Sequence, residues 1–229
     1  MKKIFSVLFF LVCIQLIGIK VAAQCGTEVK DVDGNVYHTV KIGKQCWLQE
    51  NLKTTHFRDG SAIAEMQSSE LWGSTEKSHA PAWCYYQKND TNNRMFGKLY
   101  NWYTVADPRN ICPGGWHVPS EEEYQALSDF MGGDSISSAH LRSTKVWRYP
   151  SKADNSSGFT ALPGELRTSF GDFVPNRGFD DDGYYGVFWS STPSGSLDAK
   201  FLGLYFSYLN AYISIFNKGN GMSVRCIAD

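Results

Sequence analysis

Basic runs and membrane-spanning stretches are both absent from the sequence. The 229-residue chain has a formal net charge of −1, from 22 Lys and Arg against 23 Asp and Glu, and its basic residues form no run. A surface that neutralises phosphates is therefore not expected, and we predict no nucleic-acid partner. Beyond the N-terminal segment no stretch is long and apolar enough to span a bilayer, so we do not expect an integral membrane protein.

Catalytic and metal-binding signatures are also missing. No Cys-x-x-Cys pair or Cys/His cluster has zinc-site spacing, and no Gly-x-Ser-x-Gly elbow marks a nucleophilic serine. The acidic run Glu121–Glu123 is sufficiently explained by helix capping, and His117 beside it by packing or capping. We therefore expect a non-enzymatic protein with no catalytic residue and no metal or other cofactor. An enzyme acting on polysaccharide is the alternative.

The N-terminus has the layout of a secretory signal peptide. A basic start, Met1–Lys3, precedes the apolar run Ile4–Ile19 and the small residues Val21–Ala23. A membrane-anchoring helix is the competing interpretation, but the short apolar run and the small-residue site favour cleavage after Ala23. We expect an exported protein, secreted or held at the cell surface. With no repeat or linker in the rest of the chain, residues 24–229 are predicted to form one domain.

Short strands are expected near both ends of this domain. Glu28–Val32 and Val36–Ile42 flank Asp33-Gly34-Asn35, a hairpin turn signal, and Gln45–Leu52 follows as a third extended segment. Four further strands are predicted to form an antiparallel meander at the C-terminal end. These are Val187–Ser191, Ala199–Phe206, Ala211–Phe216 and Met222–Ile227.

Helices are expected between the two sets of strands. The strongest signal is Ser120 as an N-cap with Glu123 as its capping-box partner, before an apolar stripe and a Gly-Gly stop. That stripe consists of Tyr124, Leu127, Phe130 and Met131. Helical spacing also favours Leu99–Ala106, and a shorter helix is predicted over Ser138–Thr144. Residues 53–95, apart from one short helix near Glu70, and residues 150–186 are predicted to be loops. Because strands and helices are segregated, the fold class is α+β.

Seven short phrases, in a fixed order, resemble those of a known family. They are Asp33-Gly34-Asn35-Val36-Tyr37, Trp47-Leu48-Gln49-Glu50-Asn51-Leu52, Gly97-Lys98-Leu99-Tyr100-Asn101-Trp102-Tyr103, Cys112-Pro113-Gly114-Gly115-Trp116-His117-Val118-Pro119-Ser120, Gly158-Phe159-Thr160-Ala161-Leu162-Pro163-Gly164, Trp189-Ser190-Ser191-Thr192 and Ser223-Val224-Arg225-Cys226. The chain thus resembles the Fibrobacter succinogenes major paralogous domain, which is common in exported proteins of Bacteroidetes and Fibrobacteres. The phrases around Trp116 and Trp189 are also similar to C-type-lectin-like domains, the group that includes the formylglycine-generating enzymes.

The resemblance implies a C-type-lectin-like domain with a twisted antiparallel sheet, two main helices, long loops and neighbouring termini. It also implies a disulfide between Cys112 and Cys226, because lectin-like folds often link these two places. Cys25, Cys46 and Cys84 would then hold at most one further pair, whose members stay open. Calcium-dependent lectins carry Trp-Asn-Asp where this chain has Trp189-Ser190-Ser191, so their calcium and sugar site is not expected here.

Candidate ligand-binding residues lie in the second loop region. Asp180, Asp181 and Asp182 repel one another, which a cation such as calcium or simple solvation would relieve, but their spacing is no recognised calcium loop. Tyr184 and Tyr185 follow, and we group these five residues as the candidate site. Other loop aromatics are candidates for a ligand surface or for packing: Trp72, Trp83, Tyr85 and Tyr86. We expect a binding module for carbohydrate or a surface protein; a structural surface protein without a small ligand is a further alternative.

Overall fold

A computed structural model describes residues 25–86, 94–148, 152–164, 166–174 and 183–229. Its elements have the following bounds: β1 Glu28–Lys30, β2 Val36–Ile42, β3 Gln45–Leu48, β4 Ala64–Glu65, α1 Ser69–Ser78, β5 Ala82–Tyr85, β6 Lys98–Tyr100, α3 Trp102–Val105, β7 Trp116–His117, α4 Glu121–Phe130, α5 Asp134–Leu141, β8 Leu166–Arg167, β9 Phe173–Val174, β10 Tyr185–Ser194, β11 Asp198–Tyr205, β12 Ala211–Asn217 and β13 Ile227–Ala228. The fold is α+β with mostly antiparallel pairing, as predicted. Within the described residues, no helix is long and apolar enough to cross a membrane. The expected signal peptide lies outside them.

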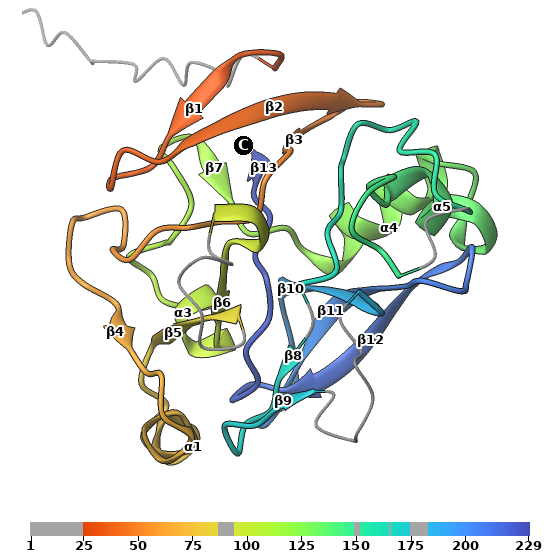
Figure 1. The fold of residues 1–229 in the computed structure, drawn as a ribbon. Coiled ribbons are helices and arrows are strands. Elements are labelled where there is room, and N and C mark those ends of the chain that lie inside the picture. Colours follow the sequence, from red (N-terminus) through yellow and green to blue (C-terminus); the bar gives the residue numbers. More distant parts are fainter. Residues whose placement is uncertain (1–24, 87–93, 149–151, 165, 175–182) are drawn as a thin grey trace, which may run out of the picture.

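The first sheet, which we call the frame sheet, has the strand order β1-β2-β3-β13-β7. The predicted hairpin is confirmed, and the Asp31 carboxylate fixes its turn by accepting hydrogen bonds from the backbone N–H groups of Asp33 and Asn35. Strand β13 pairs with both β3 and β7, with Ile227 opposite Trp47 and His117. The beginning and the end of the described chain therefore lie in one sheet, as Figure 1 shows.

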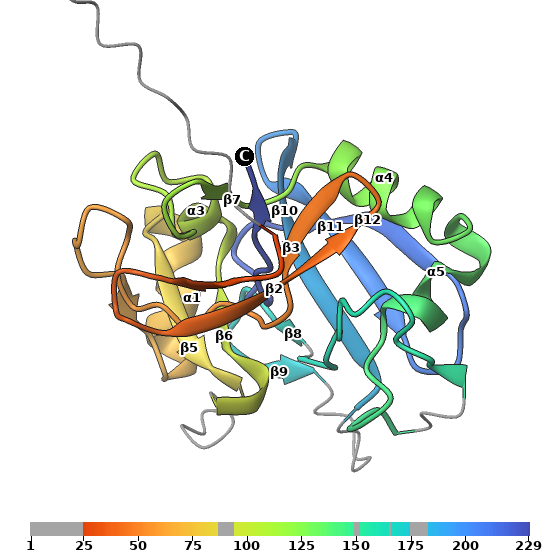
Figure 2. The ribbon, with the colours of Figure 1, turned by 90° about the horizontal axis from the view of Figure 1, so that it is seen from above.

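The second sheet, which we call the tyrosine sheet, has the order β10-β11-β12 and confirms the first three strands of the predicted meander. One of its faces packs Phe188 and Leu202 into a cluster with residues of α4 and α5. The other face packs Trp189 and Phe201 into a second cluster together with residues of the frame sheet. Figure 2 shows α4 and α5 lying along this sheet.

The prediction of a fourth meander strand over Met222–Ile227 is wrong. Residues 222–226 instead run between the two sheets, where the carbonyl of Ser223 accepts from the N–H of Trp189 on β10 and the carbonyl of Cys226 accepts from that of Leu48 on β3. All five residues are buried. Because its hydrogen bonds go to both sides, this segment joins the sheets instead of extending one of them.

Helix α4 confirms the predicted capping box. The Ser120 hydroxyl accepts from the Glu123 N–H, and the Glu123 carboxylate accepts from the Ser120 N–H. Tyr124 and Leu127 are buried as expected, but Phe130 is 63% exposed. Helix α5 begins four residues earlier than predicted, at Asp134, and ends at Leu141, because Arg142 has extended backbone.

The middle of the chain holds more structure than its composition suggested. The helix expected near Glu70 is present as α1, which is as long as α4, so the two main helices that the resemblance implied are an undercount. Strand β5 was missed, and it pairs with β6 at residues predicted to begin a helix. Helix α3 starts only at Trp102, because the Asn101 side chain accepts from the Thr104 N–H and caps it there.

Candidate functional site

The sequence-predicted residues are only partly placed. Asp180, Asp181 and Asp182 lie outside the described residues, whereas Tyr184 and Tyr185 lie at the start of β10 and are half-buried. Among the other loop aromatics, three are almost fully buried and serve packing: Trp72, Trp83 and Tyr86. Tyr85 is half-buried against the core. The two tyrosines at β10 are therefore the part of the prediction that can be followed further.

Antiparallel pairing brings three strand ends together around Tyr185. It is opposite Tyr205 on β11, and the centres of their rings are 4.8 Å apart. Tyr205 in turn lies 4.9 Å from Tyr208 in the turn that leads to β12. Tyr212, on β12, lies on the same face because it pairs with Gly203, two residues before Tyr205. The register of the sheet thus collects four tyrosines at one corner.

These side chains line a pocket of about 300 Å³, which we call the tyrosine pocket. Its lining consists of Tyr185, Tyr205, Tyr208, Asn210 and Tyr212. Tyr208 is 56% exposed, and no lining residue carries a formal charge at neutral pH. Within the described part of the chain, no hydrogen bond involves the hydroxyl of Tyr185, Tyr208 or Tyr212. The pocket therefore offers aromatic faces, hydroxyls and one amide to a ligand.

A glycine in the strand makes room for one wall of the pocket. The ring of Tyr212 lies over Gly203, where an added Cβ would come within 2.3 Å of the ring's Cζ. Burial raises the pKa of Tyr212, and neighbouring Tyr205 adds to the shift. The hydroxyl therefore stays protonated at neutral pH and can donate a hydrogen bond.

Aromatic and cationic groups support the pocket from behind. Tyr184 stacks edge to face on Phe206, with ring centres 4.6 Å apart, and the Arg148 guanidinium lies 4.9 Å from the centre of the Tyr184 ring. Below them the fully buried Arg142 donates a 2.6 Å hydrogen bond from Nη1 to the carbonyl of Phe206. This bond attaches the turn after β11 to the end of α5, so the turn is positioned by the body of the fold.

Sequence reasoning missed Tyr205, Tyr208, Asn210 and Tyr212. Tyr205 and Tyr212 fall within predicted strands, and Tyr208 and Asn210 fall between them, so none of the four was among the loop aromatics considered as ligand-binding. A usable signal was present, because the short link between the predicted strands Ala199–Phe206 and Ala211–Phe216 has a tyrosine near each of its ends. Two adjacent antiparallel strands joined by a short turn place such flanking residues near one another.

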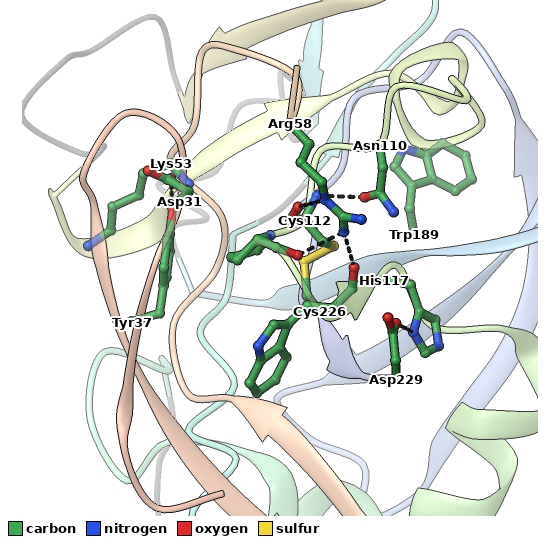
Figure 3. Close-up of a disulfide and its surroundings, with 12 residues drawn as sticks. Asp31, Tyr37, Lys53, Arg58, Asn110, Cys112, His117, Trp189, Cys226 and Asp229 are labelled. Atoms are coloured by element: carbon green, nitrogen blue, oxygen red, sulfur yellow. Dashed lines mark hydrogen bonds and ion pairs between the residues drawn. A yellow bond between two sulfur atoms is a disulfide. The ribbon is translucent and has the colours of Figure 1, made fainter. Parts of the chain in front are cut away.

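A second cluster of polar groups surrounds the Cys112–Cys226 disulfide, which is the pairing that the resemblance implied. Figure 3 shows Arg58 beside it, donating hydrogen bonds to the carbonyl groups of Cys112, Pro113 and Trp116. The second disulfide joins Cys25 to Cys46, and Cys84 is buried elsewhere. These contacts fix the loop before β7 to the last strand.

His117 lies between two carboxylates in the same region. Its Nδ1 is 2.8 Å from Asp229 Oδ1, and its Nε2 is 2.9 Å from Glu123 Oε1. The hydrogen bond with Glu123 is the main cause that raises the pKa of His117, against the effect of burial. Both ring nitrogens are occupied, so the arrangement suits a fixed ion pair that links β7 to α4 better than proton transfer to a ligand. No group of three or more His, Cys, Asp or Glu in the described ranges is arranged to hold a metal ion.

Comparison with known proteins identifies a family. The model of the Fibrobacter succinogenes major domain matches residues 40–228 of the chain. No curated protein and no solved structure matches the chain.

Proposed function

We propose that the chain, which belongs to the Fibrobacter succinogenes major domain family, is a non-enzymatic module that binds neutral carbohydrate at the tyrosine pocket. The observation that carries the proposal is the corner at which Tyr185, Tyr205, Tyr208 and Tyr212 converge around Asn210. Sugar rings present apolar C–H faces with hydroxyls at their edges. Aromatic faces bordered by hydroxyl and amide groups complement both parts.

The chemistry of the lining favours a neutral sugar over an acidic one. An acidic sugar would need a cationic partner, and the pocket lining has no Lys or Arg. The volume of about 300 Å³ is at the small end for ligand sites, which suits one or two sugar units. Binding by this route needs no calcium, in agreement with the missing calcium-lectin motif.

The export of the protein and its C-type-lectin-like class are part of the same proposal. Two disulfides support an oxidising compartment. The lectin-like class is supported by the Cys112–Cys226 link and by the sheet that holds both β1 and β13, the first and last strands of the described residues. N-terminal sequencing of protein recovered outside the cytoplasm should begin near Gln24; recovery of only the intact Met1 form inside the cell would refute export.

A glycan array followed by titration calorimetry tests the binding site. We expect neutral oligosaccharides to bind and polyuronates to fail. Tyr208→Ala should weaken binding of the best neutral glycan by roughly five- to thirty-fold, since one stacking contact is worth roughly 1–2 kcal/mol. Tyr103→Ala is the matched control, because Tyr103 stacks on His79 from helix α3, outside the pocket. Absence of any glycan ligand, or equal affinity in both variants, would contradict the proposal.

A further inference from the structure

A notch between the β2–β3 hairpin and α4 is separate from the tyrosine pocket. It has a volume of about 650 Å³, and its lining combines the apolar side chains of Ile42, Ala126 and Phe130 with Lys41 and Lys44. None of these residues lines the tyrosine pocket. Most of the lining surface is apolar, so water gains few hydrogen bonds there.

Phe130 forms a wall of this notch because of a glycine turn. Its ring rests on Gly43, where an added Cβ would come within 2.8 Å of Cδ2 of the ring. Gly43 has a φ of +60°, a left-handed conformation that the tight turn after β2 requires. The other side of the ring faces outward, and the side chain is 63% exposed although it continues the apolar stripe of α4. The exposed Phe130 ring therefore gives the notch an apolar wall that a ligand can reach from solvent.

Lys41 and Lys44 make the edge of the notch positively charged. Lys41 and Lys44 are both exposed, and in the described ranges neither makes an ion pair or a hydrogen bond through its ammonium group. They flank Gly43 in sequence, so both ammonium groups extend from the hairpin that borders the notch. An apolar cavity edged by two uncompensated cations complements a molecule with an apolar body and an anionic head.

We propose that this notch binds a free amphiphilic carboxylate of medium chain length. The tail would lie against Phe130, Ala126 and Ile42, and the carboxylate would lie between the ammonium groups of Lys41 and Lys44. The volume is within the usual range for small-molecule sites and exceeds that of the tyrosine pocket. The chain would thus carry two binding sites of different chemistry, one neutral and hydroxyl-rich and one apolar and cationic.

Calorimetric titration with two probes of closely similar tail length tests this assignment. Sodium decanoate and decyltrimethylammonium bromide, both below their micelle concentrations, differ in the sign of the head group. Decanoate should bind at one site per chain and roughly five- to thirty-fold more tightly than the cationic probe, since that ratio corresponds to the roughly 1–2 kcal/mol that two exposed lysines supply. Equal affinity for the two probes, or no saturable binding of decanoate, would overturn the proposal.

Variants locate the site and separate it from the proposed function. The pair Lys41→Gln with Lys44→Gln should remove the preference for decanoate, and Phe130→Ser should weaken both probes. Thermal melting checks that these surface variants stay folded. Tyr208→Ala should leave decanoate binding unchanged, so loss of glycan binding does not affect this test. Unchanged decanoate affinity in the lysine variant, or binding to anionic phosphatidylglycerol vesicles without binding to decanoate, would refute the site.

Discussion

The frame sheet and the tyrosine sheet use the same residue type in opposite ways. Tyr37 in the frame sheet is fully buried, donates a 2.6 Å hydrogen bond to Asp31 and accepts a 2.9 Å bond from the backbone N–H of Lys53. Tyr208 beside the tyrosine sheet is 56% exposed. The first tyrosine stabilises a hairpin, whereas the second presents a ring to solvent. An aromatic-rich composition therefore does not distinguish packing tyrosines from candidate ligand contacts; the burial of each ring and the hydrogen bonds of each hydroxyl do.

The disulfides and the buried Arg225 also lie at or beside the frame sheet, where side chains stabilise the fold. Both disulfides attach a loop to the frame sheet or to the segment that enters it. Arg225, in the segment between the sheets, is fully buried and bonds to carbonyl groups in place of a carboxylate. We infer that changes near the frame sheet lower stability, whereas changes at the corner of the tyrosine sheet alter binding.

The largest expected effect is loss of the long-range disulfide. Cys112 and Cys226 are 114 residues apart, against 21 for Cys25 and Cys46. On the chain-entropy model, the double change of Cys112 and Cys226 to Ser should lower the free energy of unfolding by about 5 kcal/mol. The same change of Cys25 and Cys46 should cost about 3 kcal/mol. Urea unfolding measures both; a larger loss for the short loop would contradict the chain-entropy account.

Replacement of Arg225 by Met should have the next largest effect. Burial lowers the pKa of Arg225 to about 10, so the group stays charged at neutral pH. Met keeps the apolar contacts but leaves the carbonyl groups of Leu48 and Phe159 and the Asn51 side chain without their donor. We expect a loss of about 3–5 kcal/mol in urea unfolding. Lys30→Met, at an exposed cation, is the control; a similar small change in both would be evidence against the role of Arg225.

Local signals in the sequence predicted local structure well. The capping box of Ser120 and Glu123 works within four residues, so its helix start could be identified without knowledge of the fold. Leu99 shows the limit of such signals. Its spacing with Trp102 suits a helix, yet Leu99 pairs with Cys84 on β5, because partners distant in sequence decide its conformation.

The candidate site was predictable only at its first residues. Tyr184 and Tyr185 stand out because they interrupt a polar loop. Tyr205 and Tyr212 become neighbours of Tyr185 only through the register of three strands, and single-sequence patterns do not contain that register. The path of residues 222–226 between two sheets was missed for the same reason. Asp180–Asp182, outside the described residues, stay a prediction.

Gly203→Ala tests the tyrosine sheet, with an intermediate effect. The new Cβ would overlap the Tyr212 ring, so the ring must move. We expect the free energy of unfolding to fall by about 1–3 kcal/mol, together with weaker glycan binding. Gly114→Ala is the control, since no atom lies within 4 Å of its added Cβ and its φ is not left-handed. Glycan affinity that survives the displacement of Tyr212 would remove that residue from the site.

The smallest expected effect is a dependence of the free energy of unfolding on pH, which arises from the ion pairs of His117. Hydrogen bonding to Glu123 raises the pKa of His117 above its ordinary 6.5, so its contribution is complete below pH 6.5 and is lost as pH rises through the folded pKa. Burial opposes the shift of Glu123, but hydrogen bonds from His117 and Ser120 outweigh it and lower its pKa below 4.5. The contribution of Glu123 is therefore complete above pH 4.5 and is lost as pH falls through its folded pKa.

The stability difference between the native protein and His117→Gln should consequently be greatest between about pH 4.5 and 6.5 and should shrink on both sides. About a third of the His117 side chain is exposed, so solvent weakens the ion pair and the maximum is expected to be modest. Urea midpoints measured at half-unit steps from pH 3.5 to 8.5 would show this window. His38→Gln is the matched control, because His38 also lies between two carboxylates, Glu28 and Glu50, but is 59% exposed. A flat difference for His117→Gln, or an equal window for His38→Gln, would show that burial beside α4 adds nothing to the ion pair. The link between the frame sheet and this helix would then rest on its other contacts, such as the hydrogen bond from the Gln45 side chain to the Glu123 carbonyl and the stacking of Trp47 on Tyr124.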